Sequence, residues 1–181
     1  MSYSVEDVIL YVVCRLGGVH GIRKLMYLLF LVQYESKHFL FRRRVVKYMC
    51  CGDPIAHANF YIWTRGPHSN EIETAVESLI NRGKLMYDCD EYGRTIIKCC
   101  DNDFVMNARL IPLLPDRVID RLDRVINKYG NFMPTKLEHY ILRKVLLMEY
   151  PAEKEDYIGM LVDEYFLTRR ISVKTVDVCC Q

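Results

Sequence analysis

Apolar residues near the start of the chain recur at the three- and four-residue spacing of one helix face. Ser4 precedes this pattern and Asp7 stands three positions later, which is the spacing of a capping box. The apolar positions are Val5, Val8, Ile9, Val12, Val13 and Leu16. The pattern therefore predicts a first helix that ends at the glycines of residues 17–18.

A second helix is predicted for residues 22–37, IRKLMYLLFLVQYESK. Between Leu25 and Val32 this segment is apolar on nearly every side. Because such a helix has no polar face to turn toward water, we expect it in the middle of the core.

Two strands are predicted downstream. Residues 41–51, FRRRVVKYMCC, place β-branched residues after a basic cluster. After a turn signal at residues 52–54, residues 60–64, FYIWT, form a second and shorter apolar run. The two strands could pair, although residues 52–59 make a long connection for a hairpin.

The next segment predicts a turn, a helix and a hairpin in succession. Gly66 and Pro67 mark the turn, Ser69 or Asn70 is the expected helix cap, and Gly83 is the expected end. The apolar face of the helix is Ile72, Ala75, Val76, Leu79 and Ile80. Two short apolar runs, KLMYDC and TIIKCC, then flank the polar turn DEYGR. A helix followed by such a hairpin is the second half of a winged helix-turn-helix unit.

The C-terminal half has a different pattern. Residues 101–115 contain two prolines and little clear period, so we interpret them as a connector. Helices are predicted for residues 116–130, 135–151 and 152–170, and a short final strand for residues 171–181.

The expected fold class is mainly α (α+β). Residues 1–100 form a winged-helix-like domain with a small β-hairpin wing, and residues 101–181 form a helical extension. That extension either packs on the first domain or makes a dimer interface. The length of 181 residues and the 51% of hydrophobic residues allow a core of this size.

Charge and hydropathy place few limits on function. The formal net charge is +2, which by itself does not indicate a nucleic-acid partner. Glu6 and Asp7 stand where a secretory signal would carry positive charge, and the most apolar run is too short to cross a bilayer. We expect a cytoplasmic protein that does not enter the membrane.

Six of the eight cysteines stand in three adjacent pairs, at residues 50–51, 99–100 and 179–180. Adjacent cysteines bond each other only with strain, so any disulfides would link distant positions. There is no Cys-x-x-Cys and no histidine at a zinc-site spacing, so we expect no metal. Buried free thiols are the favoured interpretation for a cytosolic protein. Intracellular disulfides, as in hyperthermophiles, are the alternative.

Two segments of the first half resemble the Panacea (SocA-like) family and related uncharacterised archaeal proteins. The matching motif residues are Lys24, Leu25, Tyr27, Trp63, Gly66 and Pro67. The resemblance covers about the first 100 residues. It implies a winged-helix-like, mostly helical fold and a non-enzymatic role, in bacteria often that of an antitoxin or adaptor that engages a partner protein.

A DNA-binding transcriptional regulator is the alternative. The one dense basic cluster, on the predicted strand 41–51, could share a face with basic residues of the hairpin if the hairpin folds back. The candidate nucleic-acid-binding residues are Arg42, Arg43, Arg44, Lys47, Arg65, Thr74, Ser78, Asn81, Arg82, Lys84 and Arg94. Glu71, Glu73 and Glu77 weigh against this role, because carboxylates repel the phosphates that a reading helix approaches.

No enzymatic motif is evident. The five histidines are scattered, and there is no glycine-rich phosphate loop or nucleophile elbow. His57, near Cys51 and Asp53 in sequence, could be drawn as part of a Cys-His pair, but nothing fixes its geometry. We therefore expect no catalytic residues and no cofactor. The expected partner is a protein or DNA, with a homodimer possible.

Overall fold

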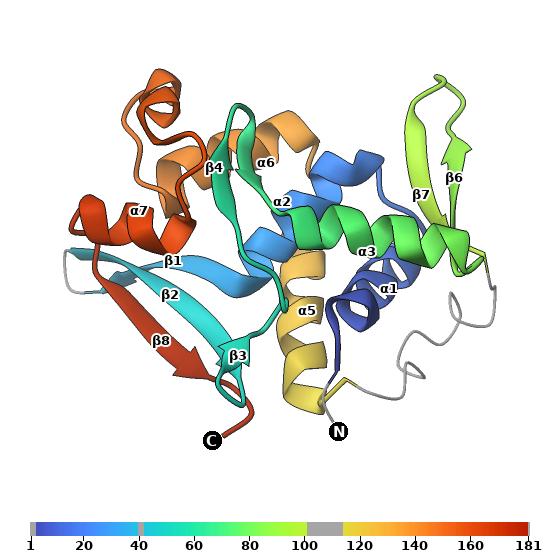
Figure 1. Ribbon diagram of the computed structural model, residues 1–181, viewed down its shortest axis with the longest axis horizontal. Coiled ribbons are helices and arrows are strands. Elements are labelled where there is room, and N and C mark those ends of the chain that lie inside the picture. The colour runs from blue at the N-terminus through green and yellow to red at the C-terminus, as the bar shows by residue number, and fades with distance from the viewer. Residues whose placement is uncertain (1–2, 40–41, 101–113, 181) are drawn as a thin grey trace.

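The computed structural model describes residues 3–39, 42–100 and 114–180, and it shows an α+β protein (Figure 1). The N-terminal elements are the helices α1 (Val5–Arg15) and α2 (Gly21–Gln33) and the strands β1 (Tyr34–Phe39), β2 (Arg42–Cys50) and β3 (Asp53–Pro54). The next elements are β4 (Tyr61–Trp63), β5 (Gly66–His68), α3 (Asn70–Asn81), β6 (Leu85–Cys89) and β7 (Thr95–Cys99). The last are α5 (Asp116–Tyr129), α6 (Pro134–Tyr140), η2 (Ile141–Val145), η3 (Pro151–Tyr157), α7 (Val162–Thr168) and β8 (Val173–Asp177).

Helix α1 begins at the expected capping box. The Ser4 hydroxyl accepts a hydrogen bond from the backbone of Asp7, and the Asp7 carboxylate accepts one from the backbone of Ser4 at 2.7 Å. Its inward side packs against α2 and α3.

Helix α2 occupies the middle of the core, as expected from its apolar pattern. Every residue from Lys24 to Gln33 is buried, and α1, α5 and α6 surround the helix. The prediction that it continues to Lys37 is wrong, because the chain becomes β1 after Gln33.

Tertiary contacts explain why α2 ends early. The guanidinium of Arg121, on α5, donates to the carbonyls of Leu31 and Val32 at 2.7 and 3.0 Å, and so satisfies two acceptors in the last turn. Strand β1 then pairs along its whole length with β2, which supplies hydrogen bonds that the next helical turn would otherwise have provided.

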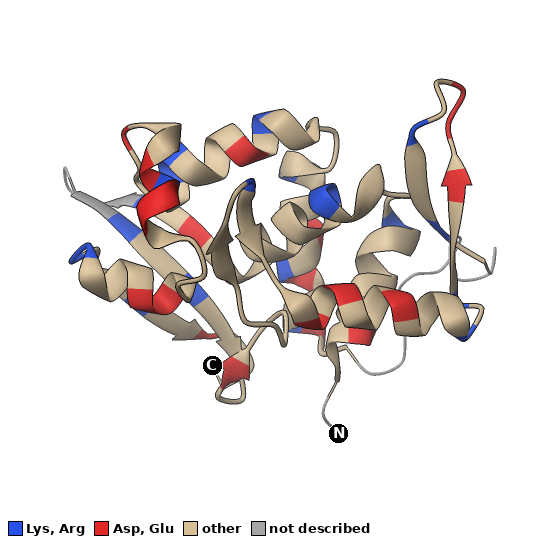
Figure 2. Ribbon diagram, turned by 45° about the horizontal axis from the view of Figure 1, so that its top comes forward, with Lys and Arg blue, Asp and Glu red and all other residues tan. Residues whose placement is uncertain are grey.

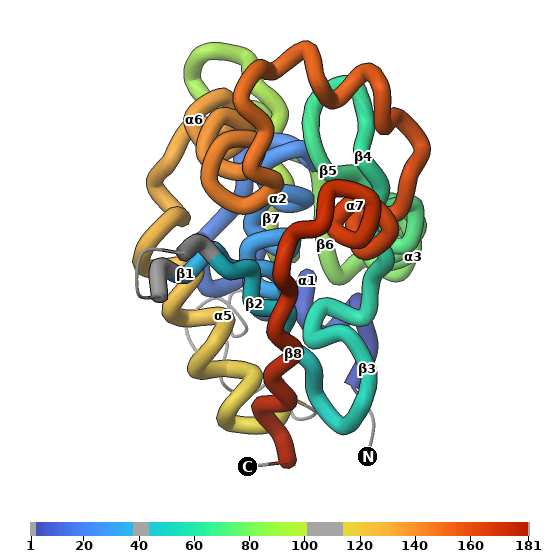
Figure 3. The backbone as a smooth tube through the Cα atoms, turned by 90° about the vertical axis from the view of Figure 1, so that its left-hand side faces the viewer, coloured from blue at the N-terminus to red at the C-terminus, as the bar shows by residue number. Residues whose placement is uncertain are grey.

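Strand β2 is the centre of the main sheet. It pairs with β1 and β3 in antiparallel fashion and with β8 in parallel, and Figure 3 shows β8 running alongside it. Residues 41–51 and 60–64, whose long connection weighed against a hairpin, do not pair with each other. Strand β4 pairs instead with β5, because a two-residue turn at Thr64 and Arg65 closes a far shorter loop.

Helix α3 and the following hairpin match the predicted succession. The turn expected at Gly66 and Pro67 is wrong, because these two residues pair with Trp63 and Ile62 as part of β5 and the turn lies just before them. Ile72, Val76 and Leu79 are buried, and α3 packs mainly against α1. The hairpin β6–β7 is attached to the body of the molecule by an isolated antiparallel bridge between Val19 and Ile97.

The C-terminal helices are shorter than predicted. The segment 135–151 is α6 followed by a π-helical stretch, and it ends before Leu147, whose φ is +56°. The predicted helix 152–170 is interrupted around Gly159, because the chain there runs alongside β4. The Gly159 backbone donates to Ile62 at 2.8 Å, and Ile62 donates back to Met160 at 2.8 Å.

The final strand is confirmed as β8, and α5 is confirmed as a one-sided helix whose buried face packs on α2. The domain boundary at residue 100 stays a prediction, and most of the connector expected at 101–115 lies outside the described residues. No helix in the described ranges is both long and apolar enough to cross a membrane.

Candidate functional site

The hairpin β4–β5 is held against the N-terminal half of α2. Gly66 has a φ of +98°, and a Cβ at this position would lie 3.4 Å from the ring of Tyr27. The Tyr27 hydroxyl donates a hydrogen bond to the carbonyl of Arg65 in the turn. Tyr27 therefore fixes both the turn and the strand that follows it.

A hollow of about 270 Å³ lies between this hairpin and α2, and we call it the Trp63 hollow. Its apolar part includes the buried side chains of Met26, Tyr27 and Pro67. Charged and polar side chains complete it. The lining residues are Ile22, Arg23, Met26, Tyr27, Trp63, Thr64, Arg65, Gly66, Pro67, His68 and Glu73.

Trp63 separates this hollow from a second one. The second, of about 210 Å³, is lined by Tyr61, Trp63, His68, Asn70 and Gly159. The rings of Trp63 and His68 are 6.0 Å apart and belong to both hollows. Trp63, the only tryptophan of the chain, is 46% exposed and offers a large apolar surface with a polar N–H group.

The Trp63 hollow has an excess of uncompensated positive charge. No ion pair joins Arg23 or Arg65 to a carboxylate in the part of the chain that the structure describes. Glu138, the carboxylate nearest the Tyr27 hydroxyl, is paired with Lys154 at 3.3 Å. Burial raises the pKa of Tyr27 and Glu138 raises it further, while Arg23 and Arg65 act in the opposite direction. Tyr27 is thus a neutral hydrogen-bond donor at physiological pH.

Glu73 is the one carboxylate among the described residues that line the same hollow, and it lies beside His68. The His68 Nε2 lies 3.0 Å from the Asn70 side-chain oxygen and 3.8 Å from a carboxylate oxygen of Glu73. These contacts orient the imidazole beside Trp63.

The motif residues fall into two groups. Tyr27, Trp63, Gly66 and Pro67 all line the Trp63 hollow, whereas Leu25 is buried in α2. Lys24 is also buried, and the loss of solvent lowers its pKa. Sequence reasoning missed Arg23, Met26, His68 and Glu73 as members of this site. The position of Arg23 and Met26 beside the motif residues of the second helix was the available signal.

The candidate DNA-binding residues do not form one surface. Arg42, Arg43, Arg44 and Lys47 stand on β2, which lies at the opposite end of the molecule from β6–β7 (Figure 1). The hairpin does not fold back over the basic strand, so the condition for a shared basic face is not met. It is attached at Val19, in the connection between α1 and α2, and projects away from the sheet.

Three of these basic side chains, Lys47, Arg82 and Arg94, have a carboxylate partner among the described residues. Lys47 contacts Asp163 at 2.6 Å, Arg94 contacts Asp90 at 2.6 Å, and Lys98, also on the hairpin, contacts Asp88 at 2.6 Å. Arg44 and Lys84 are exposed. The side chains of Arg42 and Arg43 lie outside the described part of the structure.

The outward face of α3 is mainly acidic and polar. Figure 2 shows acidic bands along this helix. Thr74 and Asn81 are exposed there. Ser78 and Arg82 are both engaged with Glu6 of α1, at 2.8 and 2.5 Å.

The cysteines differ from the favoured expectation of buried free thiols. The structure contains the disulfides Cys14–Cys99 and Cys50–Cys179, whose partners are 85 and 129 residues apart, which confirms that any disulfides link distant positions. The remaining four, Cys51, Cys89, Cys100 and Cys180, are free and exposed.

His57 offers no support for a Cys-His pair. Its ring packs edge-on against Tyr3 at 4.4 Å, and its Nε2 is buried without a hydrogen-bond partner among the described residues. Burial lowers the pKa of this imidazole.

Comparison with protein-family models, with characterised proteins and with solved structures found no match to this chain.

Proposed function

We propose that the chain is a non-enzymatic regulatory protein that binds a partner protein at the Trp63 hollow. The observation that carries this proposal is an exposed tryptophan beside two arginines without carboxylate partners, over an apolar floor. Tryptophan and arginine are the residues most enriched among the energetically dominant positions of protein interfaces. A matching partner segment would present an apolar side chain next to a carboxylate, as an acidic peptide does.

A winged-helix-like fold fits this proposal. The order α1, Val19, α2, α3, β6, β7, with Val19 bridged to Ile97, is the order of helices and strands in a winged-helix unit. Strands β1 to β5 then form an insertion between the second and third helices. The proposed site lies at the boundary between that insertion and α2, so the wing itself is not required for binding.

The geometry favours a protein partner over DNA. A nucleic-acid interface needs several basic groups on one face. Here Lys47, Arg82 and Arg94 form ion pairs with nearby carboxylates, and the outward face of α3 carries acidic side chains. The Panacea-like resemblance of the motif residues points in the same direction, toward an antitoxin or adaptor.

A photo-crosslinking experiment tests the proposal in cells that express the chain's natural partners. A photoreactive amino acid replaces Tyr61 in the second hollow, which shares Trp63 and His68 with the Trp63 hollow, and in a matched control it replaces Tyr87, an exposed tyrosine of the other hairpin. We expect one discrete adduct from position 61 that disappears when Trp63→Ala and Arg65→Ala are added. Loss of one central interface residue typically weakens binding by about 2 kcal/mol or more, roughly 30-fold.

Equal labelling from both positions, or an adduct that survives the two substitutions, would contradict the site. A mobility-shift assay with the DNA upstream of the gene tests the DNA-binding alternative. Strong DNA binding that weakens steeply with salt and is lost in the Arg42→Ala/Arg43→Ala/Arg44→Ala variant would replace the protein-partner proposal with the DNA-binding one.

A further inference from the structure

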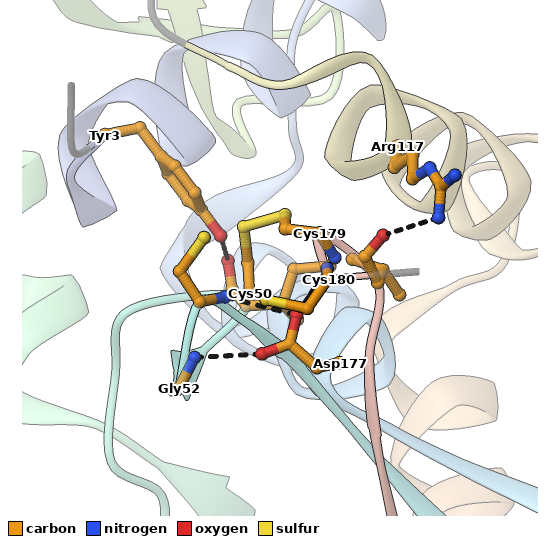
Figure 4. Close-up of a disulfide and its surroundings, with 10 residues drawn as sticks. Tyr3, Cys50, Gly52, Arg117, Asp177, Cys179 and Cys180 are labelled. Carbon is orange, nitrogen blue, oxygen red and sulfur yellow. Dashed lines mark hydrogen bonds between the residues drawn. A yellow bond between two sulfur atoms is a disulfide. The ribbon is translucent and has the colours of Figure 1, made fainter.

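Two adjacent cysteine pairs meet where the ends of β2 and β8 lie side by side. Cys50 and Cys51 end β2 and begin the turn to β3, while Cys179 and Cys180 follow β8 (Figure 4). The sulfur atoms of Cys50, Cys51 and Cys179 all lie within 4.8 Å of one another. Cys180 follows Cys179 directly, and its backbone donates to the same Asp177 carboxylate as the backbone of Cys51.

The backbone explains how neighbouring cysteines bring both sulfurs to one place. Successive side chains of a strand point to opposite faces. Cys51 leaves this alternation because its φ is +52°, a conformation that is uncommon for residues other than glycine. Its side chain therefore turns toward the same cluster as that of Cys50.

The frame of the cluster does not depend on the disulfide. The Asp177 carboxylate accepts backbone hydrogen bonds from Cys51 and Gly52 on one side, at 3.2 and 2.9 Å. It also accepts them from Cys179 and Cys180 on the other side, at 3.0 and 3.2 Å. A backbone hydrogen bond of 2.9 Å from Val178 to Met49 continues the pairing of the two strands. One carboxylate thus holds both cysteine turns against each other.

We propose that Cys50, Cys51, Cys179 and Cys180 form a redox-gated metal site that binds Zn²⁺ through four thiolates once the Cys50–Cys179 disulfide is reduced. Zinc–sulfur distances of about 2.3 Å in a tetrahedron require sulfur–sulfur separations of roughly 3.8 Å. The sulfur atoms of Cys50, Cys51 and Cys179 already lie within 4.8 Å of one another, and Cys180 would supply the fourth ligand by turning toward them. Cys51 and Cys180 are exposed and give the ion a path of entry.

The site forms in two steps, reduction of the disulfide and then binding of Zn²⁺. A thiol reductant of the glutathione class transfers two electrons to the disulfide, which yields the Cys50 and Cys179 thiols and one oxidised reductant disulfide. Zn²⁺ then displaces four protons from the four thiols. The oxidised disulfide of the same reductant can take the two electrons back, which re-forms the Cys50–Cys179 disulfide and regenerates two reductant thiols. This removes two ligands and releases the ion, so the oxidised chain and the metal-bound chain exclude each other.

The test uses the full chain, reduced and kept without oxygen, and titrated with Co²⁺ and Zn²⁺. We expect one ion per chain in native mass spectrometry, the visible absorption of tetrahedral thiolate-bound Co²⁺, and its displacement by Zn²⁺. The Cys51→Ser/Cys180→Ser variant keeps the residues of the disulfide and alters only exposed side chains. We expect its Zn²⁺ affinity to fall more than about 100-fold, since even loss of an outer-shell partner costs roughly 10–100-fold.

The matched control is Cys89→Ser/Cys100→Ser, which removes the other two free, exposed cysteines and should bind Zn²⁺ as the natural chain does. The natural chain with its disulfide intact should bind no ion at this site. Three outcomes would overturn the proposal. They are absence of metal in the reduced chain, equal binding by the Cys51→Ser/Cys180→Ser variant, and equal binding by the chain whose Cys50–Cys179 disulfide is intact.

Discussion

The arginines on two sides of α2 are used in opposite ways. Arg121 is 4% exposed and fully engaged: it donates to two carbonyls at the end of α2, contacts Glu35 at 3.2 Å, and stacks over the Tyr48 ring at 3.9 Å. Arg23 and Arg65, at the other end of the helix, line an open hollow and have no ion pair among the described residues. A buried cation is tolerated only when its partners replace water, so Arg121 belongs to the fold. Cations without partners at a concave apolar surface are available for a ligand.

Replacing Arg121 with Ala should give the largest effect of those expected here. The change leaves Glu35 without its buried partner and exposes two helix-end carbonyls to an apolar environment. Removal of one member of a buried ion pair costs about 3–5 kcal/mol, so the midpoint of urea unfolding should fall sharply. Arg124→Ala, an exposed arginine of the same helix, is the control and should change stability by less than about 0.5 kcal/mol. Similar losses of unfolding free energy for both variants would contradict the conclusion that Arg121 is needed for the stability of the fold.

Lowering the pH should weaken the ion pair between Arg121 and Glu35 by protonating Glu35. The expected loss of unfolding free energy is smaller than for Arg121→Ala. Burial alone would raise the pKa of Glu35, but the Tyr48 hydrogen bond and the Arg121 charge outweigh it and lower the pKa overall. Because the folded pKa lies below the unfolded value, the stabilisation is complete above the unfolded pKa. It is lost as the pH falls through the folded pKa.

Urea unfolding of the natural chain and of Glu35→Gln, compared from pH 6 downward, measures this effect. The difference in unfolding free energy between the two should shrink as the solution becomes acidic. A difference that stays constant across the titration would show that the charge of Glu35 contributes nothing.

On the hollow side, Gly66→Ala should lower stability and binding together. A left-handed backbone at a residue with a side chain costs on the order of 1–3 kcal/mol, and the new methyl group would also press on Tyr27. Gly93→Ala at the tip of β6–β7 is a close match, since its φ of +73° is also positive but nothing lies within 4 Å of the added Cβ. Thermal unfolding should therefore show a larger loss for Gly66→Ala, and only this variant should lose the crosslink at position 61.

Arg94→Ala should have the smallest effect. Its ion pair with Asp90 is half exposed on the arginine side, and such pairs contribute about 0–1 kcal/mol. Arg65→Ala should be equally mild in unfolding experiments but should weaken partner binding. If both variants leave partner binding unchanged, the Trp63 hollow loses its assigned role.

Local patterns were sufficient for elements whose stability depends on one-sided burial. Helix α3 carries Ile72, Val76 and Leu79 at helical spacing with a glycine past its end, and the structure has these residues buried at the expected place. The hairpin β6–β7 likewise follows from two short apolar runs around a polar turn. Hydrophobic period and turn chemistry act over a few residues, so the sequence predicts them directly.

Elements that depend on distant partners were predicted less well. The helix expected to reach Lys37 ends at Gln33 because β2 and Arg121 compete for its last turn, and the helix expected over 152–170 is broken because β4 pairs with the chain at Gly159 and Met160. The candidate site has the same character. The sequence motif identified four residues of the site, Tyr27, Trp63, Gly66 and Pro67. Arg23, His68 and Glu73 could be assigned to the site only from the packing of the β4–β5 hairpin on α2.

The sequence by itself determined where the chain turns, which helix is central and which short motifs are unusual, because propensity and period are properties of neighbouring residues. Only the tertiary structure decided which strands pair, which cations are satisfied and which cysteines meet. Cys50 and Cys179 are 129 positions apart, and the parallel pairing of β2 with β8 is what brings their sulfurs together. Such long-range contacts require the closing of loops whose free energy depends on the whole fold, and no local pattern encodes that term.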